Sequence, residues 1–366
     1  MTLRAVGAAG LALGLFAASA VALVLALSLA LEPPQLARAA DPGRWTETGR
    51  STIPLYYYQG MTSDPAKRLF FNGVHVGLYR TDQHLHEEAR RDDVIPSDVH
   101  AREGYNHIGD IDWDAREGGR ILLPLECYYP RAAPDNTEDP NNTCRTGAIG
   151  VADPETLAWR YYVKLDPAEI PKAMWAEVSP DGELLWTGSR RDLLAYDMDD
   201  IREANAHPAA PPIKAVKRLA GARPPSGITG AAFFRGRFYV AGQDNPAGFQ
   251  IWSIDLETGA GQLEIEREVV GESEGIEFFE GLGGQLHWMI QPYNQESVPT
   301  YGVSNGTILH FTPKDEPAGA SGPAQRPAKI RLTASPRHIR SGRVTRVRFR
   351  ARATIAGRDE PVNGAK

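Results

Sequence analysis

The 366-residue sequence predicts an all-β protein whose main domain is a β-propeller of five four-stranded blades. Three observations lead to this prediction. Five segments between residues 41 and 312 each read as a strand, a tight polar turn and a second strand. In four of the five, the next segment is apolar and breaks at an aspartate, and in several repeats a fourth strand follows. The segments start about 45 to 70 residues apart, which is typical of propeller blades.

The blades follow one another along the chain and leave one strand to be supplied. The five segments begin at Gln59, His107, Ala176, Thr229 and Glu274. The fifth repeat ends near residue 311 without a fourth strand of its own. We therefore expect the segment around Ser51–Tyr58 to pair with the strand around Thr307–Phe311, which would close the ring and remove both open edges. A sixth blade within 82–106 or 199–225 is the alternative.

Residues 1–40 are predicted to be a signal peptide or an N-terminal membrane anchor. An almost unbroken apolar run from Ala5 to Leu31 follows a single basic residue, Arg4. The small residues Ala37 and Ala39 favour cleavage near residue 39 or 40, whereas the length of the run would also allow an uncleaved anchor. In both cases we expect the rest of the chain to be exported, either secreted or held at the cell envelope.

The two cysteines, Cys127 and Cys144, are the only ones in the chain. In an oxidising compartment they are expected to form one disulfide bond. The bond would close a loop of prolines, asparagines and acidic residues that buries too little apolar surface to order itself.

The sequence after the main domain changes in composition twice. Residues 313–328 form a linker rich in Pro, Gly and Ala. Within residues 329–366 the stretch RVTRVRFRARA alternates apolar and arginine positions, which predicts a half-buried strand. This part resembles the opening strands of bacterial immunoglobulin-like modules, so we expect it to be an incomplete immunoglobulin-like β segment.

Charge is divided unevenly along the chain. The whole sequence has a formal net charge of −6, while by direct count residues 41–312 carry −16 and residues 329–366 carry +9. An acidic main domain excludes nucleic acid as a partner and favours cations. The expected partner is a small molecule or a component of the envelope, and contact with a membrane is expected only through an uncleaved N-terminal segment.

One sequence motif for hydrolysis is present, but its context differs from the motif's usual one. GESEG at 271–275 matches G-x-S-x-G and would make Ser273 a nucleophile. That motif requires a helix after the serine, whereas the residues after Ser273 read as strand, turn and strand. The match is therefore interpreted as accidental.

The strongest candidate site is HIGDIDWD, which starts at His107. On a strand, Asp110, Asp112 and Asp114 share one face. Buried aspartates require hydrogen bonds or a cation, and Ca²⁺ prefers carboxylate oxygens. Glu274 and Glu277 begin the inner strand of another blade and are expected to converge on the same site. The predicted metal ligands are thus Asp110, Asp112, His107, Glu274 and Glu277. The alternative is that Asp114 opens a turn while Asp110 and Asp112 accept backbone or arginine hydrogen bonds.

A second cluster contains His84, His86 and His100. His-x-His on a strand points two imidazoles the same way, so with a third ligand the cluster would suit zinc or copper. Surface histidines in a charged loop are the alternative.

The inner-strand motifs EGIEFF and HIGDIDWD resemble those of secreted bacterial propellers in the gluconolactonase and phytase-like esterase groups. The resemblance implies calcium bound by acidic residues at the mouth of the propeller channel. The starts at Gln59, Ala176 and Thr229 depart from the set of acidic ligands that the lactonase group has.

Two functions follow from these features. The first is an exported binding or interaction module that presents an acidic ring. The second is a calcium-dependent hydrolase of a lactone or phosphoester, with Asp110, Asp112, Glu274 and His107 around the ion and a metal-bound water as nucleophile. Convergence of those four side chains would favour the enzyme, and their dispersal would favour the binding module.

Overall fold

The computed structural model describes most of residues 44–314 and three later strands. The described ranges are 44–57, 59–73, 76–127, 146–189, 192–204, 211–220, 227–244, 248–267, 271–292, 305–314, 329–335, 348–355 and 358–361. The predicted signal or anchor (1–40), the linker after residue 314 and Cys144 lie outside these ranges, so the predictions made for them stay predictions.

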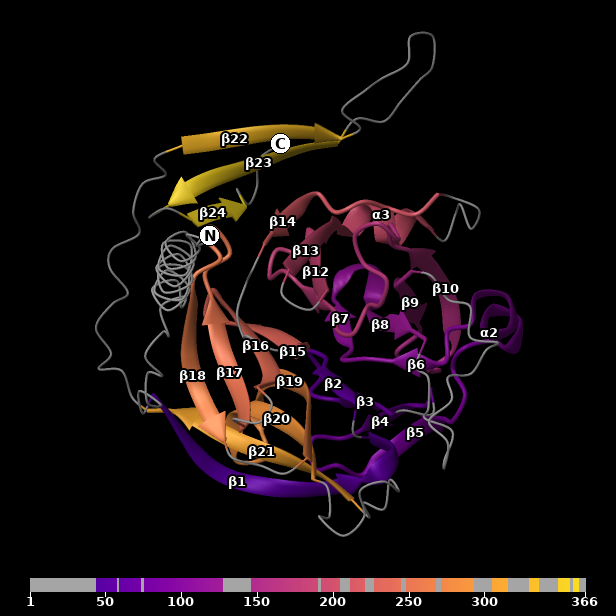
Figure 1. The fold of residues 1–366 in the computed structure, drawn as a ribbon, viewed down its shortest axis with the longest axis vertical. Coiled ribbons are helices and arrows are strands. Elements are labelled where there is room, and N and C mark those ends of the chain that lie inside the picture. Colours follow the sequence, from indigo (N-terminus) through magenta and orange to yellow (C-terminus); the bar gives the residue numbers. More distant parts are fainter. Residues whose placement is uncertain are drawn as a thin grey trace, which may run out of the picture. The chain divides into compact units, whose positions relative to one another are not determined.

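The described part of residues 44–314 is a five-bladed propeller, as the repeats predict (Figure 1). Blade 1 consists of β2 (Gly60–Ser63), β3 (Leu69–Asn72), β4 (Leu78–Thr81) and β5 (Glu87–Arg91). Blade 2 consists of β6 (His107–Ile108), β7 (Asp112–Asp114), β8 (Arg120–Glu126), β9 (Ala148–Ala152) and β10 (Trp159–Lys164). Its inner strand is divided, because β6 and β7 both pair with β8.

The other three blades repeat the four-stranded antiparallel meander. Blade 3 consists of β11 (Glu177–Val178), β12 (Leu184–Ser189), β13 (Asp192–Asp197) and β14 (Lys217–Leu219). Blade 4 consists of β15 (Ile228–Phe234), β16 (Arg237–Asp244), β17 (Gly248–Ile254) and β18 (Gly261–Arg267). Blade 5 consists of β19 (Gly271–Gly281), β20 (Gly284–Pro292), β21 (Asn305–Pro313) and, at its outer edge, β1 (Trp45–Pro54).

The inner strands form a closed ring around the propeller axis. Contacts join β2 to β7, β7 to β11, β11 to β15, β15 to β19, and β19 back to β2. Figure 1 shows β2, β7, β15 and β19 near the centre of the ring. Residues two positions apart on an inner strand therefore lie at successive levels along the axis.

Two of the tight turns expected between first and second strands have a defined geometry. Arg235 and Gly236 connect β15 to β16, and Leu282 and Gly283 connect β19 to β20; all four have positive φ. Two positive φ angles in a two-residue loop define the type I′ turn, which matches the twist of antiparallel strands. Glycine at the second position explains why these dipeptides end a strand.

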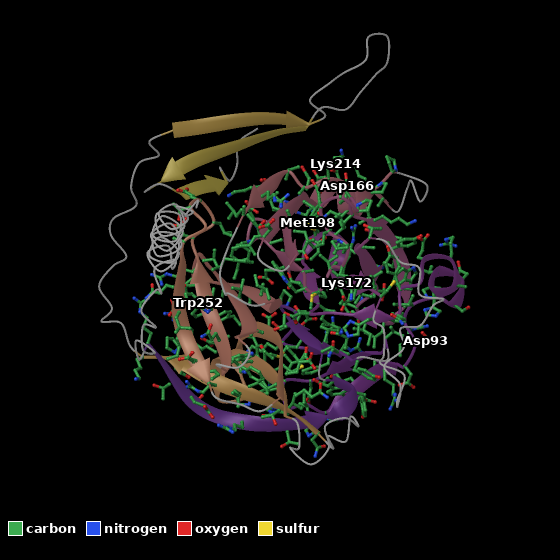
Figure 2. All side chains as sticks on the ribbon, in the orientation of Figure 1. Asp93, Asp166, Lys172, Met198, Lys214 and Trp252 are labelled. Atoms are coloured by element: carbon green, nitrogen blue, oxygen red, sulfur yellow. The ribbon has the colours of Figure 1, made fainter. Side chains whose placement is uncertain are left out.

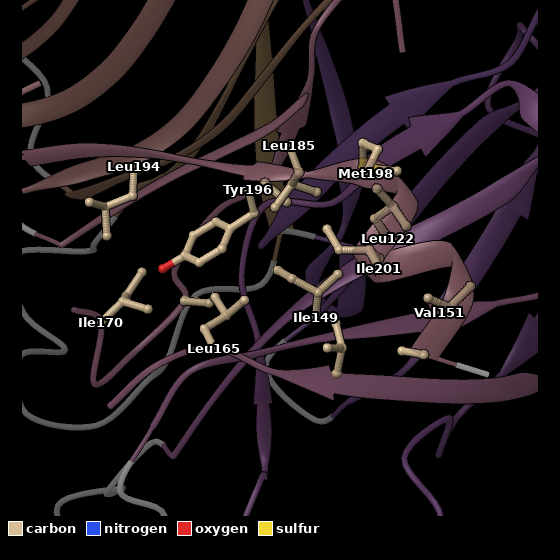
Figure 3. Close-up of a cluster of buried hydrophobic side chains, with 14 of the residues drawn as sticks. Leu122, Ile149, Val151, Leu165, Ile170, Leu185, Leu194, Tyr196, Met198 and Ile201 are labelled. Carbon is tan, nitrogen blue, oxygen red and sulfur yellow. The ribbon is translucent and has the colours of Figure 1, made fainter. Parts of the chain in front are cut away.

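The hydrophobic core consists of five clusters, each of which lies between two neighbouring blades. Figure 3 shows the cluster between blades 2 and 3, where Leu122, Ile149 and Val151 face Leu185 and Tyr196. Because each blade buries both of its faces, its middle strands have almost continuous apolar burial; in β8, for example, all seven residues are buried.

The predicted closure of the ring is confirmed, with a shifted boundary. β1 pairs with β21 in antiparallel register, with Ser51 opposite Ile308 and Thr52 opposite Thr307. The strand starts earlier than predicted and ends at Pro54, and Leu55–Tyr57 form the short 3-10 helix η1. Proline has no N–H to donate, so it ends the pairing there.

The alternative of a sixth blade is wrong for the described residues of both segments. The stretch 82–106 holds β5 and the helix α2 (Ser97–Glu103). The stretch 199–225 holds the end of the helix α3 (Met198–Glu203) and the strand β14. Both strands are the fourth strand of a blade that is already counted.

The strands predicted after residue 328 are present and form a sheet of their own. β22 (Lys329–Ser335), β23 (Arg348–Ile355) and β24 (Arg358–Pro361) pair in antiparallel order. β23 contains the second half of the alternating arginine stretch. Three strands do not establish an immunoglobulin-like fold, so that part of the prediction stays untested.

Two further results bear on the predictions for the termini and the cysteines. Within the described residues, no helix has the length and apolar character needed to span a membrane. Cys127 directly follows β8 and is buried, 1% exposed. Because Cys144 is not among the described residues, the disulfide stays a prediction.

Candidate functional site

Asp110 lies in the break between β6 and β7, where the inner strand of blade 2 meets blade 3. Its backbone N–H donates to the carbonyl of Met174 (3.0 Å), and its own carbonyl accepts from the N–H of Ala176 (3.0 Å). This parallel bridge leaves the residue 1% exposed at the propeller axis. The divided inner strand of blade 2 therefore directs one aspartate to the centre of the ring.

The Asp110 carboxylate accepts backbone hydrogen bonds from three further blades. Its Oδ1 accepts from the N–H of Met61 (3.1 Å) in blade 1. Its Oδ2 accepts from the N–H groups of Ala231 (3.3 Å) in blade 4 and Ile276 (3.4 Å) in blade 5. One residue thus links the inner strands of all five blades.

A glycine precedes each of these three donors and makes room for the carboxylate. A Cβ on Gly275 would lie 2.1 Å from Asp110 Oδ1, and one on Gly230 would lie 2.7 Å from Oδ2. A Cβ on Gly60 would lie 2.6 Å from the Asp110 Cα. Any larger residue at these positions would clash, so the glycines are part of the way the chain seats Asp110.

Burial raises the pKa of Asp110 well above its ordinary value. The hydrogen bond from Met61 acts against this shift, and the carboxylates of Glu277 and Asp112 raise the pKa further. Both carboxylate oxygens are already hydrogen-bonded to backbone N–H groups. Asp110 therefore behaves as the backbone acceptor that the alternative interpretation described.

One level further along the inner strands, three carboxyl groups form what we call the acidic cluster: Asp112 on β7, Glu177 on β11 and Glu277 on β19. Asp112 Oδ1 accepts from Thr62 Oγ1 (3.2 Å), and Oδ2 accepts from the N–H of Val178 (2.6 Å). Asp112 and Glu177 are each 7% exposed, and Glu277 is the least buried of the three.

The two glutamates of the acidic cluster are also held by the backbone of inner strands. Glu177 Oε1 accepts from the N–H of Phe233 (2.7 Å) in blade 4, and Glu277 Oε1 accepts from the N–H of Phe278 (2.9 Å) in its own strand. These bonds fix one oxygen of each carboxyl group. The orientation of the cluster is therefore set before any ligand arrives.

The acidic cluster has strongly perturbed protonation. Burial raises the pKa of Asp112 to about 7, against opposing hydrogen bonds from Val178 and Trp113. Burial is also the largest influence on Glu177 and Glu277; the charge of Asp112 then raises the pKa of both glutamates still further. Like charges brought together in a poorly hydrated place resist simultaneous ionisation, so the cluster binds protons at pH values where free carboxyl groups would not.

The other two predicted ligands, Glu274 on β19 and His107 on β6, lie nearer the N-terminal ends of the inner strands than the level of Asp110. Glu274 Oε1 accepts from Gln59 Nε2 (3.1 Å), and burial followed by the charge of Glu272 raises the pKa of Glu274 well above normal. His107 Nδ1 lies 2.9 Å from Glu126 Oε1. Lys172, labelled in Figure 2, approaches the other oxygen of Glu126 at 3.8 Å.

The Asp114 carboxylate is directed away from the propeller axis, towards the helix α3. It forms a two-pronged ion pair with Arg202 of α3, at 2.7 and 2.9 Å, and also accepts from the N–H of Arg116. Asp114 is 1% exposed and the Arg202 side chain 6% exposed. The alternative in which Asp114 opens the DAREGG turn agrees with the bond from Arg116. The ion pair with Arg202 was not expected, because arginine was considered only as a donor to Asp110 and Asp112.

The five predicted ligands are therefore divided among three levels rather than gathered. Along the propeller axis, Asp112 and Glu277 share one level and Asp110 lies at the next. Glu274 and His107 lie on the far side of Asp110 from the acidic cluster. Sequence reasoning missed Glu177 and Thr62. Glu177 comes two residues after Trp175, which bridges to Asp110, and Thr62 follows Met61, which donates to Asp110. Both therefore occupy the same position in their repeats as Asp112 and Glu277, and this shared repeat position is the signal in the sequence.

Among the described residues, no group of three or more His, Cys, Asp or Glu side chains has an arrangement suited to holding a metal ion. The calcium prediction is thus left without geometric support and stays a prediction. The same holds for zinc or copper at the histidines: His86 pairs with Asp82 at 3.0 Å, and His100, on α2, bonds the carbonyl of Tyr105 at 2.8 Å.

The interpretation of GESEG as an accidental match is confirmed by its secondary structure. Ser273 lies within β19, which continues to Gly281, and a tight turn and β20 follow. Its side chain is fully buried and its Oγ accepts from Trp288 Nε1 (3.0 Å). A serine in the middle of a strand cannot form a nucleophile elbow.

Comparisons with known proteins found no matching family and only remote structural similarity. No protein-family model and no curated protein matches the chain. Among solved structures, a PQQ-bound aldose sugar dehydrogenase from Streptomyces coelicolor is 12% identical, with a TM-score of 0.36 over 75% of this chain and 100% of that one. A luciferin-regenerating enzyme is 10% identical, with a TM-score of 0.42 over 72% of this chain and 95% of that one.

A third similar structure, the WD40 repeats of RRP9, is 9% identical, with a TM-score of 0.35 over 69% of this chain and 67% of that one. Enzymes and a repeat domain are thus similar to the chain to the same low degree. These similarities carry no argument about activity. The narrower resemblance to the gluconolactonase and phytase-like groups stays a prediction.

Proposed function

We propose that this protein is an exported binding module and that the acidic cluster of Asp112, Glu177 and Glu277 binds a positively charged ligand. The observation that supports the proposal is the meeting of three carboxyl groups from three blades at one level of the propeller axis, with raised pKa values. Burial raises these pKa values, and the charge of Asp112 raises those of Glu177 and Glu277 further; a bound cation would offset that repulsion.

Three further features fit a cationic ligand. Thr62 and the partly exposed Ser63 contribute hydroxyl groups beside the cluster, and both hydrogen-bond Glu277. Glu277 is the least buried carboxyl group of the cluster, so a ligand would reach the cluster from its side. The net charge of −16 on residues 41–312 attracts cations over a longer range.

The dispersal of the predicted ligands favours binding over hydrolysis. A hydrolase with a metal-bound water requires Asp110, Asp112, Glu274 and His107 around one ion. Instead, the Asp110 oxygens accept from backbone N–H groups, Glu274 bonds Gln59 and His107 lies beside Glu126. No two of the four share a hydrogen-bond partner in these contacts.

The proposed ligand is positively charged, and two kinds of ligand have that property. The ammonium group of an organic amine would donate hydrogen bonds to these carboxylates, and we favour it because no group of three or more His, Cys, Asp or Glu side chains among the described residues is arranged to hold a metal ion. Ca²⁺, which prefers carboxylate and hydroxyl oxygens, is the alternative. Calcium is the ion that the sequence suggests. The experiment below separates the two kinds of ligand.

The test is the melting temperature of the purified protein after treatment with chelator and dialysis, with Ca²⁺ or the diamine putrescine added back. A ligand at about 100 times its dissociation constant stabilises the folded state by roughly 2.7 kcal/mol, so we expect a rise of several degrees with one of the two probes. Asp112→Asn and Glu277→Gln should abolish the rise. Glu274→Gln is the matched control, because Glu274 lies on the other side of Asp110, and this variant should keep the rise in melting temperature.

Two outcomes would overturn the proposal. One is a wild-type melting temperature that neither probe changes. The other is a rise that survives in both Asp112→Asn and Glu277→Gln. Calcium-dependent hydrolysis of a lactone or phosphoester by the wild type would instead establish the hydrolase, and Glu274→Gln would then lose activity.

A further inference from the structure

A single chain of hydrogen bonds crosses all four strands of blade 5. Ser51 Oγ on β1 lies 2.8 Å from His310 Nε2 on β21. His310 Nδ1 lies 2.8 Å from His287 Nδ1 on β20, and His287 Nε2 lies 3.0 Å from the carbonyl oxygen of Phe279 on β19. The chain runs from the outer edge of the blade to its inner strand.

The carbonyl at the inner end fixes where every proton lies. A carbonyl oxygen only accepts, so His287 Nε2 carries a proton and donates to Phe279. In a neutral His287 the Nδ1 is then an acceptor, and the proton between the two rings belongs to His310 Nδ1. His310 Nε2 is left as an acceptor, so the Ser51 hydroxyl donates to it.

Both imidazoles are neutral because they are buried. His287 and His310 are 0% and 1% exposed, and burial lowers the pKa of His287 to about 3 and the pKa of His310 to about 4. The ring of Phe279 stacks on His287 with centroids 3.9 Å apart. Phe279 therefore holds His287 by its ring and by its carbonyl, and His287 in turn holds His310.

Ser51 is the accessible end of this chain. It is partly exposed and lies on β1, the edge strand of the blade. An activated nucleophile is recognised by a hydroxyl within hydrogen-bond reach of a base that a third group orients, and these residues meet that description. The feature lies in blade 5 and shares no residue with the acidic cluster.

We propose that Ser51 is a reactive nucleophile toward activated esters, with His310 as its general base and His287 as a positioning residue. Ser51 Oγ forms a bond to the acyl carbon while its proton moves to His310 Nε2. The bond from the acyl carbon to the leaving oxygen then breaks, and the leaving group takes that proton from His310. Water releases the acyl group from Ser51 by the same proton transfers.

The experiment uses a fluorophosphonate, which forms a bond from Ser51 Oγ to phosphorus and releases fluoride and a proton. Peptide mass spectrometry of the labelled full chain should find the adduct on Ser51. We expect Ser51 to react at least about 100-fold faster than the exposed Ser97 in the same sample, the lower range of general-base assistance. Ser51→Ala should lose the adduct, while Ser97→Ala should keep it.

The roles of the two histidines are separated by variants and by pH. His310→Gln should slow labelling of Ser51 by about 100-fold. His287→Gln, whose amide can also accept from His310, should slow it less than His287→Ala does. Should these variants unfold, the wild type still gives an answer: its labelling rate should be constant near neutral pH and fall as pH approaches the pKa of His310, about 4.

The proposal is overturned if Ser51 in the wild type is labelled no faster than Ser97. It is equally overturned if labelling persists at full rate in a folded His310→Gln variant. Either result would show that the hydrogen bonds from Ser51 to Phe279 serve only to hold β1 to the rest of the blade.

Discussion

The carboxylate of Asp110 lies 3.1 Å from the backbone nitrogen of Met61, which belongs to a different blade. The same carboxylate accepts from Ala231 and Ile276 in two further blades. Backbone N–H groups on inner strands that face the axis have no neighbouring strand to pair with there. Asp110 supplies the acceptor that the sheets themselves do not provide, and buried polar groups of this kind require one.

The first prediction is that Asp110→Asn lowers the free energy of unfolding by about 2 kcal/mol or more. Asparagine keeps the size of the side chain, but its amide group presents N–H donors to one or two backbone N–H groups and leaves them unsatisfied. Urea denaturation measures the loss. Asp92→Asn, an exposed carboxylate, is the control and should change stability by less than about 0.5 kcal/mol. Equal stability of the two variants would show that Asp110 is not the link between blades.

The second prediction concerns pH. Burial raises the pKa of Asp112 in the folded protein to about 7 from an ordinary value of 3.8. Between these values the folded state binds more protons than the unfolded state, so the contribution of Asp112 to stability falls as pH rises from about 4 to 7. The slope is at most about 1.4 kcal/mol per pH unit for one group.

Denaturation of the chelator-treated protein from pH 4 to pH 8 checks this prediction. Asp112→Asn removes the titrating group, so its stability should fall less over that interval than the stability of the wild type. Asp92→Asn should follow the wild type. If Asp112→Asn and the wild type have parallel profiles, the carboxyl group of Asp112 does not titrate in this range.

The fold could be predicted because its signals are local. Each blade repeats strand, polar turn and strand, and dipeptides such as Arg235–Gly236 mark where the strands reverse. The closing strand could also be predicted, because the fifth repeat lacked a partner for β21. Its boundary was less accessible, since only the pairing register shows that Trp45 begins the strand and Pro54 ends it.

The site was harder to predict because it depends on which residues meet at one level. The sequence shows Asp110 and Asp112 two residues apart, but it does not show that Asp110 accepts backbone hydrogen bonds from three other blades while Asp112 lies beside Glu177. The three glycines before Met61, Ala231 and Ile276 carried the missing signal.

His287 and His310 illustrate the same limit. They are 23 residues apart on strands that were expected, yet their contact requires the register that sets them opposite each other. Cross-strand partners are fixed by the turn and loop geometry rather than by any local pattern.

The last prediction tests whether the N-terminal strand is an integral part of the propeller. Trp45, the first residue of β1, is 5% exposed and packs in the cluster between blades 4 and 5. Its ring lies 5.9 to 6.1 Å, centroid to centroid, from the rings of Phe234, Tyr239 and Phe278. Trp45→Ala removes this anchor and should lower the free energy of unfolding by about 3 to 5 kcal/mol in urea denaturation. Val216→Ala, at an apolar residue that is 57% exposed, is the control and should change stability by less than about 0.5 kcal/mol. A loss in Trp45→Ala no larger than in the control would mean that the rest of the ring holds together without β1.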